Sequence, residues 1–184
     1  MPAGAMMHRG PTQGGGMQAG SLFRRALTFA LVFSLLQLTW QVLRDTAAGR
    51  LLIEDAIVHP AAAAVNLLTP QVHARAAGST VKARGGGLNI INGCEGTETL
   101  FLLAAAFTVA PLSRRARAAG FLLGVPVVFA VNQLRILALF YANRGHPALF
   151  DLLHATVTPI AVVVLVAGYF HVWLVAHPRT AAPG

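Results

Sequence analysis

The sequence predicts an all-α integral membrane protein, with about four transmembrane helices and one amphipathic helix on the membrane surface. Of its 184 residues, 55% are hydrophobic and only 11% are charged, whereas soluble domains carry about 25% charged residues. The apolar residues gather in long segments, and a bilayer core needs roughly 20 residues of helix. At this length we expect a single membrane domain, which we place at residues 21–179.

Charge and cysteine content exclude several classes of protein. The formal charge is +8, but so few charged residues beside several apolar spans cannot form a groove for nucleic acid. The arginines instead cluster beside apolar segments, as the positive-inside rule predicts. The single cysteine forms no internal disulfide and no C-x-x-C redox pair. His59, His73 and His146 lack the spacing of a metal motif such as H-E-x-x-H, so we expect no metal and no cofactor.

The N-terminal part predicts a tail and a first span. Residues 1–20 contain six glycines and two prolines without an apolar period, which indicates a disordered cytoplasmic tail. Arg24 and Arg25 then precede eighteen uncharged residues, giving a span at about 24–43. A cleavable signal peptide is the rival interpretation. The apolar segment exceeds the about 7–15 residues of a signal core, which favours a retained anchor.

Residues 44–93 are expected to lie outside the cytoplasm. The stretch 51–68 has apolar residues at helical spacing but is interrupted by polar ones and by Pro60. This pattern favours an amphipathic helix lying on the membrane over a span. The sequence leaves open whether the segment dips into the bilayer. Residues 72–87 are short, polar and glycine-rich, which indicates a loop with room for a hairpin.

The second span is expected at residues 94–112. Only fifteen uncharged residues run from position 99 to position 113, so a span of roughly 20 residues must begin several positions earlier. Asn92 with Glu95 three residues later resembles a capping box. If that cap forms, Cys94 lies in the first helical turn.

Two further spans complete the expected bundle. They are placed at 119–141 and 155–176, after a basic loop at 113–118 and a polar link at 143–151. The N-terminal tail, the basic loop and the C-terminus hold seven Lys/Arg and no acids, while the other side of the membrane holds six Lys/Arg, with Arg135 excluded, and all six acids. The positive-inside rule therefore places both termini in the cytoplasm of a multi-pass protein of the cytoplasmic (inner) membrane.

This topology brings three reactive residue types to one outer membrane face. Cys94 lies at the outer end of the second span, His154 at the entrance of the fourth, and Arg135 roughly 9 Å below the outer end of the third. A helix N-terminus and a nearby guanidinium both favour the reactive thiolate. A helix N-terminus also disfavours a cationic imidazole, which leaves His154 able to act as a base.

Each of these residues also has a structural interpretation. A lone cysteine is more often a small buried hydrophobe than a nucleophile, and a lone histidine is usually structural. Arg135 within a span is costly, and it can reach the outer interface or pair with Glu98 or Asp151. The candidate donors that would support the site are Asn92, Asn132 and Thr156. In the simpler interpretation each of them only caps a helix or forms an ordinary hydrogen bond between spans.

The three reactive residues stand in motifs that resemble those of the exosortase/archaeosortase family of membrane cysteine transpeptidases. The matching blocks are Gly93-Cys94-Glu95-Gly96 before a span, Asn132-Gln133-Leu134-Arg135-Ile136, and Leu152-Leu153-His154. Residues 60–70 also resemble a family segment, and the resemblance covers roughly residues 50–175. The chain departs from the family pattern in two respects. Glu95 stands where many members have a small hydroxyl residue, and the chain has fewer spans than many members, as a short form would.

The resemblance implies an enzyme in which Cys94 is the nucleophile, His154 carries the proton, and Arg135 stabilises the thiolate or the oxyanion. Its substrates would be membrane-tethered proteins with a C-terminal sorting signal. They would be cleaved at the outer face of the membrane and transferred to an acceptor. Besides these substrates, the lipid bilayer is the expected partner, and no nucleic acid is expected.

The alternative is a non-catalytic membrane subunit that binds and positions partner transmembrane helices. Small residues at 104–106, Gly120 and Gly124 would suit close helix packing. A small transporter is a weaker interpretation, because the sequence shows no inverted repeat. The sequence leaves the oligomeric state, the substrate and the choice between transfer and hydrolysis open.

Overall fold

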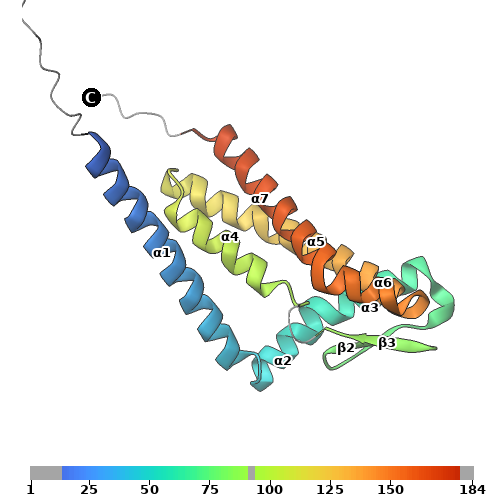
Figure 1. Ribbon diagram of the computed structural model, residues 1–184. Coiled ribbons are helices and arrows are strands. Elements are labelled where there is room, and N and C mark those ends of the chain that lie inside the picture. The colour runs from blue at the N-terminus through green and yellow to red at the C-terminus, as the bar shows by residue number, and fades with distance from the viewer. Residues whose placement is uncertain (1–13, 91–93, 179–184) are drawn as a thin grey trace, which may run out of the picture.

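Helices make up most of the structure, with one small sheet near one end (Figure 1). The computed structural model describes residues 14–90 and 94–178. In chain order the elements are α1 (Gly14–Leu43), α2 (Ala47–Ile53), η1 (Glu54–Val58), α3 (His59–Leu68), η2 (Pro70–Val72), β1 (Arg75–Ala77), β2 (Thr80–Ala83), β3 (Gly86–Asn89), α4 (Thr97–Val109), α5 (Arg114–Gly145), α6 (Pro147–Leu152), η3 (Leu153–Val157) and α7 (Thr158–Ala176).

Four helical segments in the described part of the chain are long and apolar enough to cross a membrane. They are Gly20–Leu43, Ala47–Leu68, Arg114–Gly145 and Ala148–Ala176. The predicted fold class, an all-α membrane protein with about four spanning helices, is confirmed. The sheet is an addition to it.

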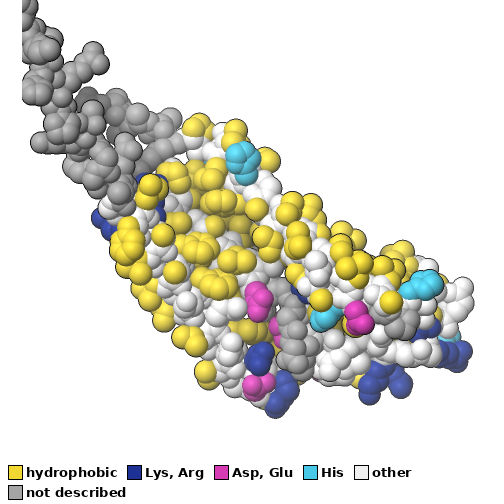
Figure 2. Space-filling view, in the orientation of Figure 1, with side chains coloured by type: hydrophobic (Ala, Val, Ile, Leu, Met, Phe, Trp, Pro, Cys, Tyr) yellow, Lys and Arg dark blue, Asp and Glu magenta, His cyan; other side chains and the backbone are white. Residues whose placement is uncertain are grey.

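The helix α1 presents its apolar side chains outward. The exposed fraction is 55–63% for Leu27, Leu31, Leu35 and Leu38. In Figure 2 hydrophobic side chains cover a broad surface in the region where α1, α4 and α7 lie in Figure 1. A continuous apolar surface of this kind suits lipid rather than water.

The start of α1 corrects one predicted boundary. The helix begins at Gly14, so the second part of the predicted tail 1–20 is helical. Arg24 and Arg25 mark the N-terminal limit of the apolar stretch. They do not mark the start of the helix, because charged side chains leave its backbone hydrogen bonds intact. The first part of that tail, residues 1–13, lies outside the described residues.

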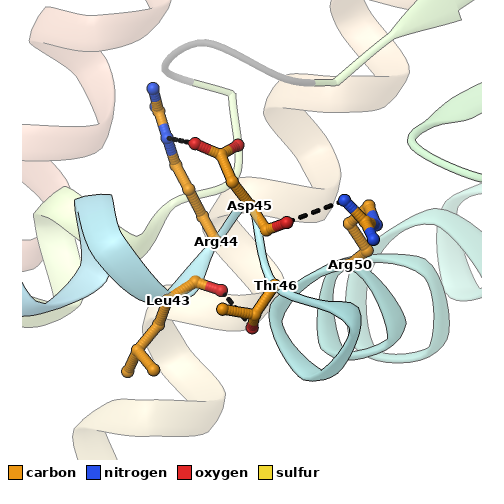
Figure 3. A network of polar contacts seen from close by, with 5 residues as sticks. All are labelled: Leu43, Arg44, Asp45, Thr46 and Arg50. Atoms are coloured by element: carbon orange, nitrogen blue, oxygen red, sulfur yellow. Dashed lines mark hydrogen bonds and ion pairs between the residues drawn. The ribbon is translucent and has the colours of Figure 1, made fainter.

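A polar corner turns the chain from α1 into α2, as Figure 3 shows. The hydroxyl of Thr46 caps α2 by accepting a hydrogen bond from a backbone N–H of its first turn, and it donates to the Leu43 carbonyl at 2.6 Å. Arg50 donates to the Asp45 carbonyl at 2.7 Å. A cap of this type contributes about 1 kcal/mol, so side chains help to fix the direction in which the chain leaves α1.

The segment predicted as a surface helix at 51–68 is a continuous helix from Ala47 to Leu68. Its middle part, η1, is a π-turn that directly precedes α3 and its Pro60. A π-turn lets the helix continue past a proline, whose ring and missing N–H disrupt regular α-helix. The segment packs against α5 and the sheet. Because it is also long enough to be a span, its place on the membrane surface remains a prediction.

The region expected to be a loop, residues 72–87, contributes to a three-stranded antiparallel sheet in the order β1-β2-β3. Val81 of β2 and Leu88 of β3 are paired and buried. Asn66 of α3 exchanges two hydrogen bonds with the backbone of Ala74, both at 2.7 Å. The strands of the sheet are only three or four residues long. The alternation of apolar and polar residues is therefore difficult to recognise among the glycines of the sequence.

The span predicted at 94–112 corresponds to a shorter helix. The helix α4 has 13 residues, fewer than the roughly 20 of a typical span. It begins after Gly96, whose φ is +78°, and it ends at Val109, since Ala110 before Pro111 is extended. Cys94 therefore precedes the helix, and the prediction that it lies in the first helical turn is wrong. The predicted cap, Asn92, lies outside the described residues.

The predicted polar link at 143–151 is mostly helical. Only His146 separates α5 from α6. The segments α6, η3 and α7 then follow without a break. His154 therefore lies about two turns inside a helix, and the predicted position at a helix entrance is wrong.

The glycines of α5 pack against the protein's own helices. A Cβ atom at Gly120 would lie 2.5 Å from Nε1 of Trp173, and one at Gly124 would lie 2.5 Å from Cδ2 of Leu103. Tyr169 also donates its hydroxyl to the Gly120 carbonyl at 2.6 Å. These small residues therefore bring α4, α5 and α7 together within the chain.

Basic residues lie at both ends of the bundle, and a hollow at the sheet end is lined by Arg75, Lys82 and Arg84 among others. The start of α1, the turn between α4 and α5, and the end of α7 lie at one end, and the sheet and α6 lie toward the other (Figure 1). Two hollows at the first end are lined by basic residues, one by Arg24, Arg25 and Arg117, the other by Arg114 and His177 among others. The first end therefore carries the basic character that the positive-inside rule expects of a cytoplasmic side.

Candidate active site

Cys94 lies on the segment that connects β3 to α4, and its side chain is 1% exposed. The Cys94 carbonyl accepts a hydrogen bond from Nδ2 of Asn132 on α5 at 3.1 Å. Gly96 has no Cβ, which lets the segment pass directly against the Asn132 side chain. Cys94 is thus held to α5 through its backbone, just before α4 begins.

His154 contacts Cys94 although the two are 60 positions apart in the sequence. The distance from Sγ to Nδ1 is 3.5 Å, which is within hydrogen-bonding range for sulfur. The imidazole stacks on Phe150, with ring centroids 5.4 Å apart and planes within 6°. Stacking on one side and the thiol on another restrict the direction of the ring. A thiol next to an imidazole is the pairing that nucleophilic thiol chemistry requires.

Arg135 approaches the same thiol from α5. Its Nε donates to the Thr158 hydroxyl at 3.1 Å, and that hydroxyl donates to the Leu153 carbonyl at 2.8 Å. Thr158 and Leu153 belong to the helical segment that also carries His154. The guanidinium and the imidazole are therefore oriented by one stretch of backbone.

Three influences act on the pKa of the Cys94 thiol, which lies outside the membrane-spanning helices. Burial is the largest and raises the pKa, the Arg135 guanidinium lowers it, and the Glu95 carboxylate raises it. The pKa ends above the ordinary value for cysteine. The thiol at rest therefore keeps its proton, and it needs a base to become a nucleophile.

Sequence reasoning named all three of these residues and Asn132, but it missed Thr158. A signal was present, because Thr158 follows His154 by four residues, the spacing that places two side chains on one helix face. The hydroxyl residue suggested instead, Thr156, is exposed and takes no described part in the site. The contribution of Phe150 was also missed.

No group of three or more His, Cys, Asp or Glu side chains is placed to hold a metal ion in the part of the chain that the structure describes. His59, His73 and His146 are all exposed. The described site offers a nucleophile, a group that can accept and return a proton, and a fixed cation.

Comparison with protein families gives a match over most of the chain. A family model described as a transmembrane exosortase matches residues 16–176. No curated protein and no solved structure matches the chain. The matched range includes Cys94, Arg135 and His154 together with all the helices that could cross a membrane.

Proposed function

Because the chain belongs to the transmembrane exosortase family, we propose that this multi-pass membrane protein is a cysteine transpeptidase that uses Cys94, His154 and Arg135. The observation that carries the proposal is the 3.5 Å contact between Cys94 Sγ and His154 Nδ1. The electrostatic effect of Arg135 on the same thiol supports it. The three side chains come from three separate segments of the chain, and a convergence of this kind is typical of an active site.

In the first half of the reaction, His154 accepts the thiol proton while Cys94 Sγ attacks a peptide carbonyl carbon. The new S–C bond produces a tetrahedral oxyanion, which the Arg135 guanidinium stabilises. A fixed donor in this role is worth roughly 3–4 kcal/mol. The intermediate collapses as the C–N bond breaks, and the imidazolium gives its proton to the leaving amine. A thioester on Cys94 remains.

In the second half, an acceptor nucleophile attacks the thioester carbonyl. Its proton passes to His154, the C–S bond breaks, and the imidazolium returns the proton to the Cys94 thiolate. Water in place of the acceptor would give hydrolysis. Both halves use the same three side chains, so no additional group of this chain is needed.

The substrates we propose are membrane-tethered proteins with a C-terminal sorting signal. We place the site at the outer face of the cytoplasmic membrane, since the basic residues of the α4–α5 turn and the N-terminal arginines gather at the opposite end of the bundle. A substrate anchored by its own helix would then present its signal at the height of Cys94.

The direct test is Cys94→Ala in cells, with the size of a candidate substrate as the readout. We expect unprocessed precursor to accumulate while the variant protein is still found in the membrane. His154→Gln and Arg135→Lys should act in the same direction. Thr156→Ala, an exposed change close to His154 in sequence, is the matched control and should leave processing unchanged.

Unchanged processing by membrane-located Cys94→Ala protein would reject the proposal and favour the non-catalytic subunit. One structural observation weighs against that alternative. The glycines of α5 that would suit a partner helix already pack against Trp173 and Leu103 of this chain.

A further inference from the structure

Glu95 is a buried acid next to the proposed nucleophile, and the reaction above does not use it. Its side chain is 6% exposed. Its Oε1 atom is buried and has no hydrogen-bond donor within the described residues. A buried carboxylate is normally paired with a cation or held by several donors. A donor that arrives with a bound substrate would satisfy this atom.

Two neighbouring polar atoms also lack partners. Asn132 uses Nδ2 on the Cys94 carbonyl, but its Oδ1 is buried without a donor among the residues that the structure describes. The buried hydroxyl of Thr97, which can donate or accept, has no partner there either. Gly96, between Glu95 and Thr97, packs on Asn132, so these atoms surround one turn of the backbone. Two acceptor oxygens in this region, one on Glu95 and one on Asn132, therefore lack a donor among the described residues.

The proposed nucleophile shares this enclosure, because Cys94 is 1% exposed. A substrate can reach Sγ only if the region opens, and an opening at Cys94 also uncovers its sequence neighbour. An extended peptide carries backbone N–H groups on both sides of its scissile carbonyl, and its lysine or arginine side chains add cationic donors. Those are the groups that the region lacks.

One other charged group that acts on the thiol does so in the opposite sense. Arg135 from α5 favours the thiolate, and His154 from η3 contacts the thiol directly. Glu95 is thus the anionic group that opposes thiolate formation at this site.

We propose that Glu95 couples substrate binding to activation of Cys94. Its carboxylate opposes loss of the thiol proton in the resting enzyme, and a cationic or hydrogen-bond-donating group of the substrate removes this opposition by pairing with it. The role of Cys94 as nucleophile rests on the proposed function, whereas the charge coupling between the two side chains does not.

The test uses the full-length protein in detergent and a small neutral reagent, methyl methanethiosulfonate. Cys94 is the only cysteine, so modification measured by intact mass reports on this thiol alone. In Glu95→Gln, which keeps the side-chain size and removes the charge, the pH of half-maximal labelling rate should fall by about one unit. The rate at neutral pH should rise about threefold, because a less basic thiolate is also a weaker nucleophile.

The matched control is Glu98→Gln, which removes the same charge from an exposed position three residues away. Its pH profile should coincide with that of the unmodified protein. Glu95→Asp, which keeps the charge, should stay near the original midpoint. A Glu95→Gln profile that is unshifted, or shifted no more than that of Glu98→Gln, would overturn the proposal.

A second measurement compares two charged reagents on the same thiol. The labelling rate of Cys94 is measured for a methanethiosulfonate bearing a trimethylammonium group and for one of similar size bearing a sulfonate. Glu95→Gln should reduce the ratio of the first rate to the second about threefold or more. An unchanged ratio in Glu95→Gln would also refute the proposal. Since labelling requires no turnover, these results are independent of the processing test of Cys94→Ala.

Discussion

Replacing Gly96 by alanine tests the backbone geometry that positions Cys94. Gly96 has φ of +78°, and a Cβ atom there would lie 2.7 Å from Cγ of Asn132 and 3.0 Å from its Nδ2. The left-handed conformation costs an alanine about 1–2 kcal/mol. Overpacking against a buried side chain costs a further about 1–3 kcal/mol. Gly96→Ala should therefore destabilise the protein by about 2–5 kcal/mol.

Thermal unfolding of the purified protein measures this cost. For a chain of this size, about 2–4 °C per kcal/mol gives an expected fall of roughly 4–20 °C in the unfolding temperature. The variant should also process substrate more slowly, because the clash displaces Asn132, whose Nδ2 holds the Cys94 carbonyl.

Two other glycines separate the contributions. Gly78 has φ of +59° but open space around its Cβ position, so Gly78→Ala should show the backbone cost alone. Gly168 is helical and open, so Gly168→Ala should show neither cost. If Gly96→Ala unfolds at the temperature of Gly78→Ala, the contact with Asn132 contributes nothing. If it unfolds at the temperature of Gly168→Ala, both parts of the reasoning are wrong.

Three further predictions concern the site and the bundle. Thr158→Val removes an acceptor of Arg135 and should lower the processing rate about tenfold without loss of protein from the membrane; Thr156→Val is its control and should match the unmodified protein in both measurements. Gly120→Ala places a methyl group 2.5 Å from a tryptophan nitrogen of α7. It should destabilise the protein by about 1–3 kcal/mol and therefore lower the unfolding temperature. An unchanged unfolding temperature would show that α5 and α7 can move apart at no cost. Burial raises the pKa of Cys94, so its thiolate forms only as the pH rises past that higher value, and half-maximal labelling should come above the about pH 8.5 of an ordinary cysteine; a midpoint below it would contradict the direction of the shift.

The fold class followed from the sequence because membrane-spanning helices are determined by length and composition, which are local properties. The apolar stretches of α1, α5 and α7 could be recognised one at a time. For the sheet, only a loop with room for a hairpin could be predicted, because its strands are short and their pairing depends on contacts such as that between Asn66 and Ala74. The ends of the helices were also misplaced, most clearly at α4 and α6.

The error at α4 has a physical cause that the local sequence does not reveal. The pattern from Asn92 to Glu95 fits a capping box, yet the helix begins only after Gly96. Gly96 and Cys94 are fixed by Asn132, which lies 38 positions from Cys94 in the sequence. The three reactive residues could be named from their motifs, but whether and how they touch depends on such long-range contacts.

The π-turn η3 links the membrane environment to the proposed chemistry. Pro159 follows Thr158 in the chain and, like Pro60 after η1, is the second residue after a π-turn. Within a bilayer an unpaired backbone group costs several kcal/mol, and here the Leu153 carbonyl accepts from both the N–H and the hydroxyl of Thr158. The same hydroxyl accepts from Arg135. The local solution to a proline in a helix therefore also orients the proposed oxyanion-stabilising residue, beside the turn that carries His154.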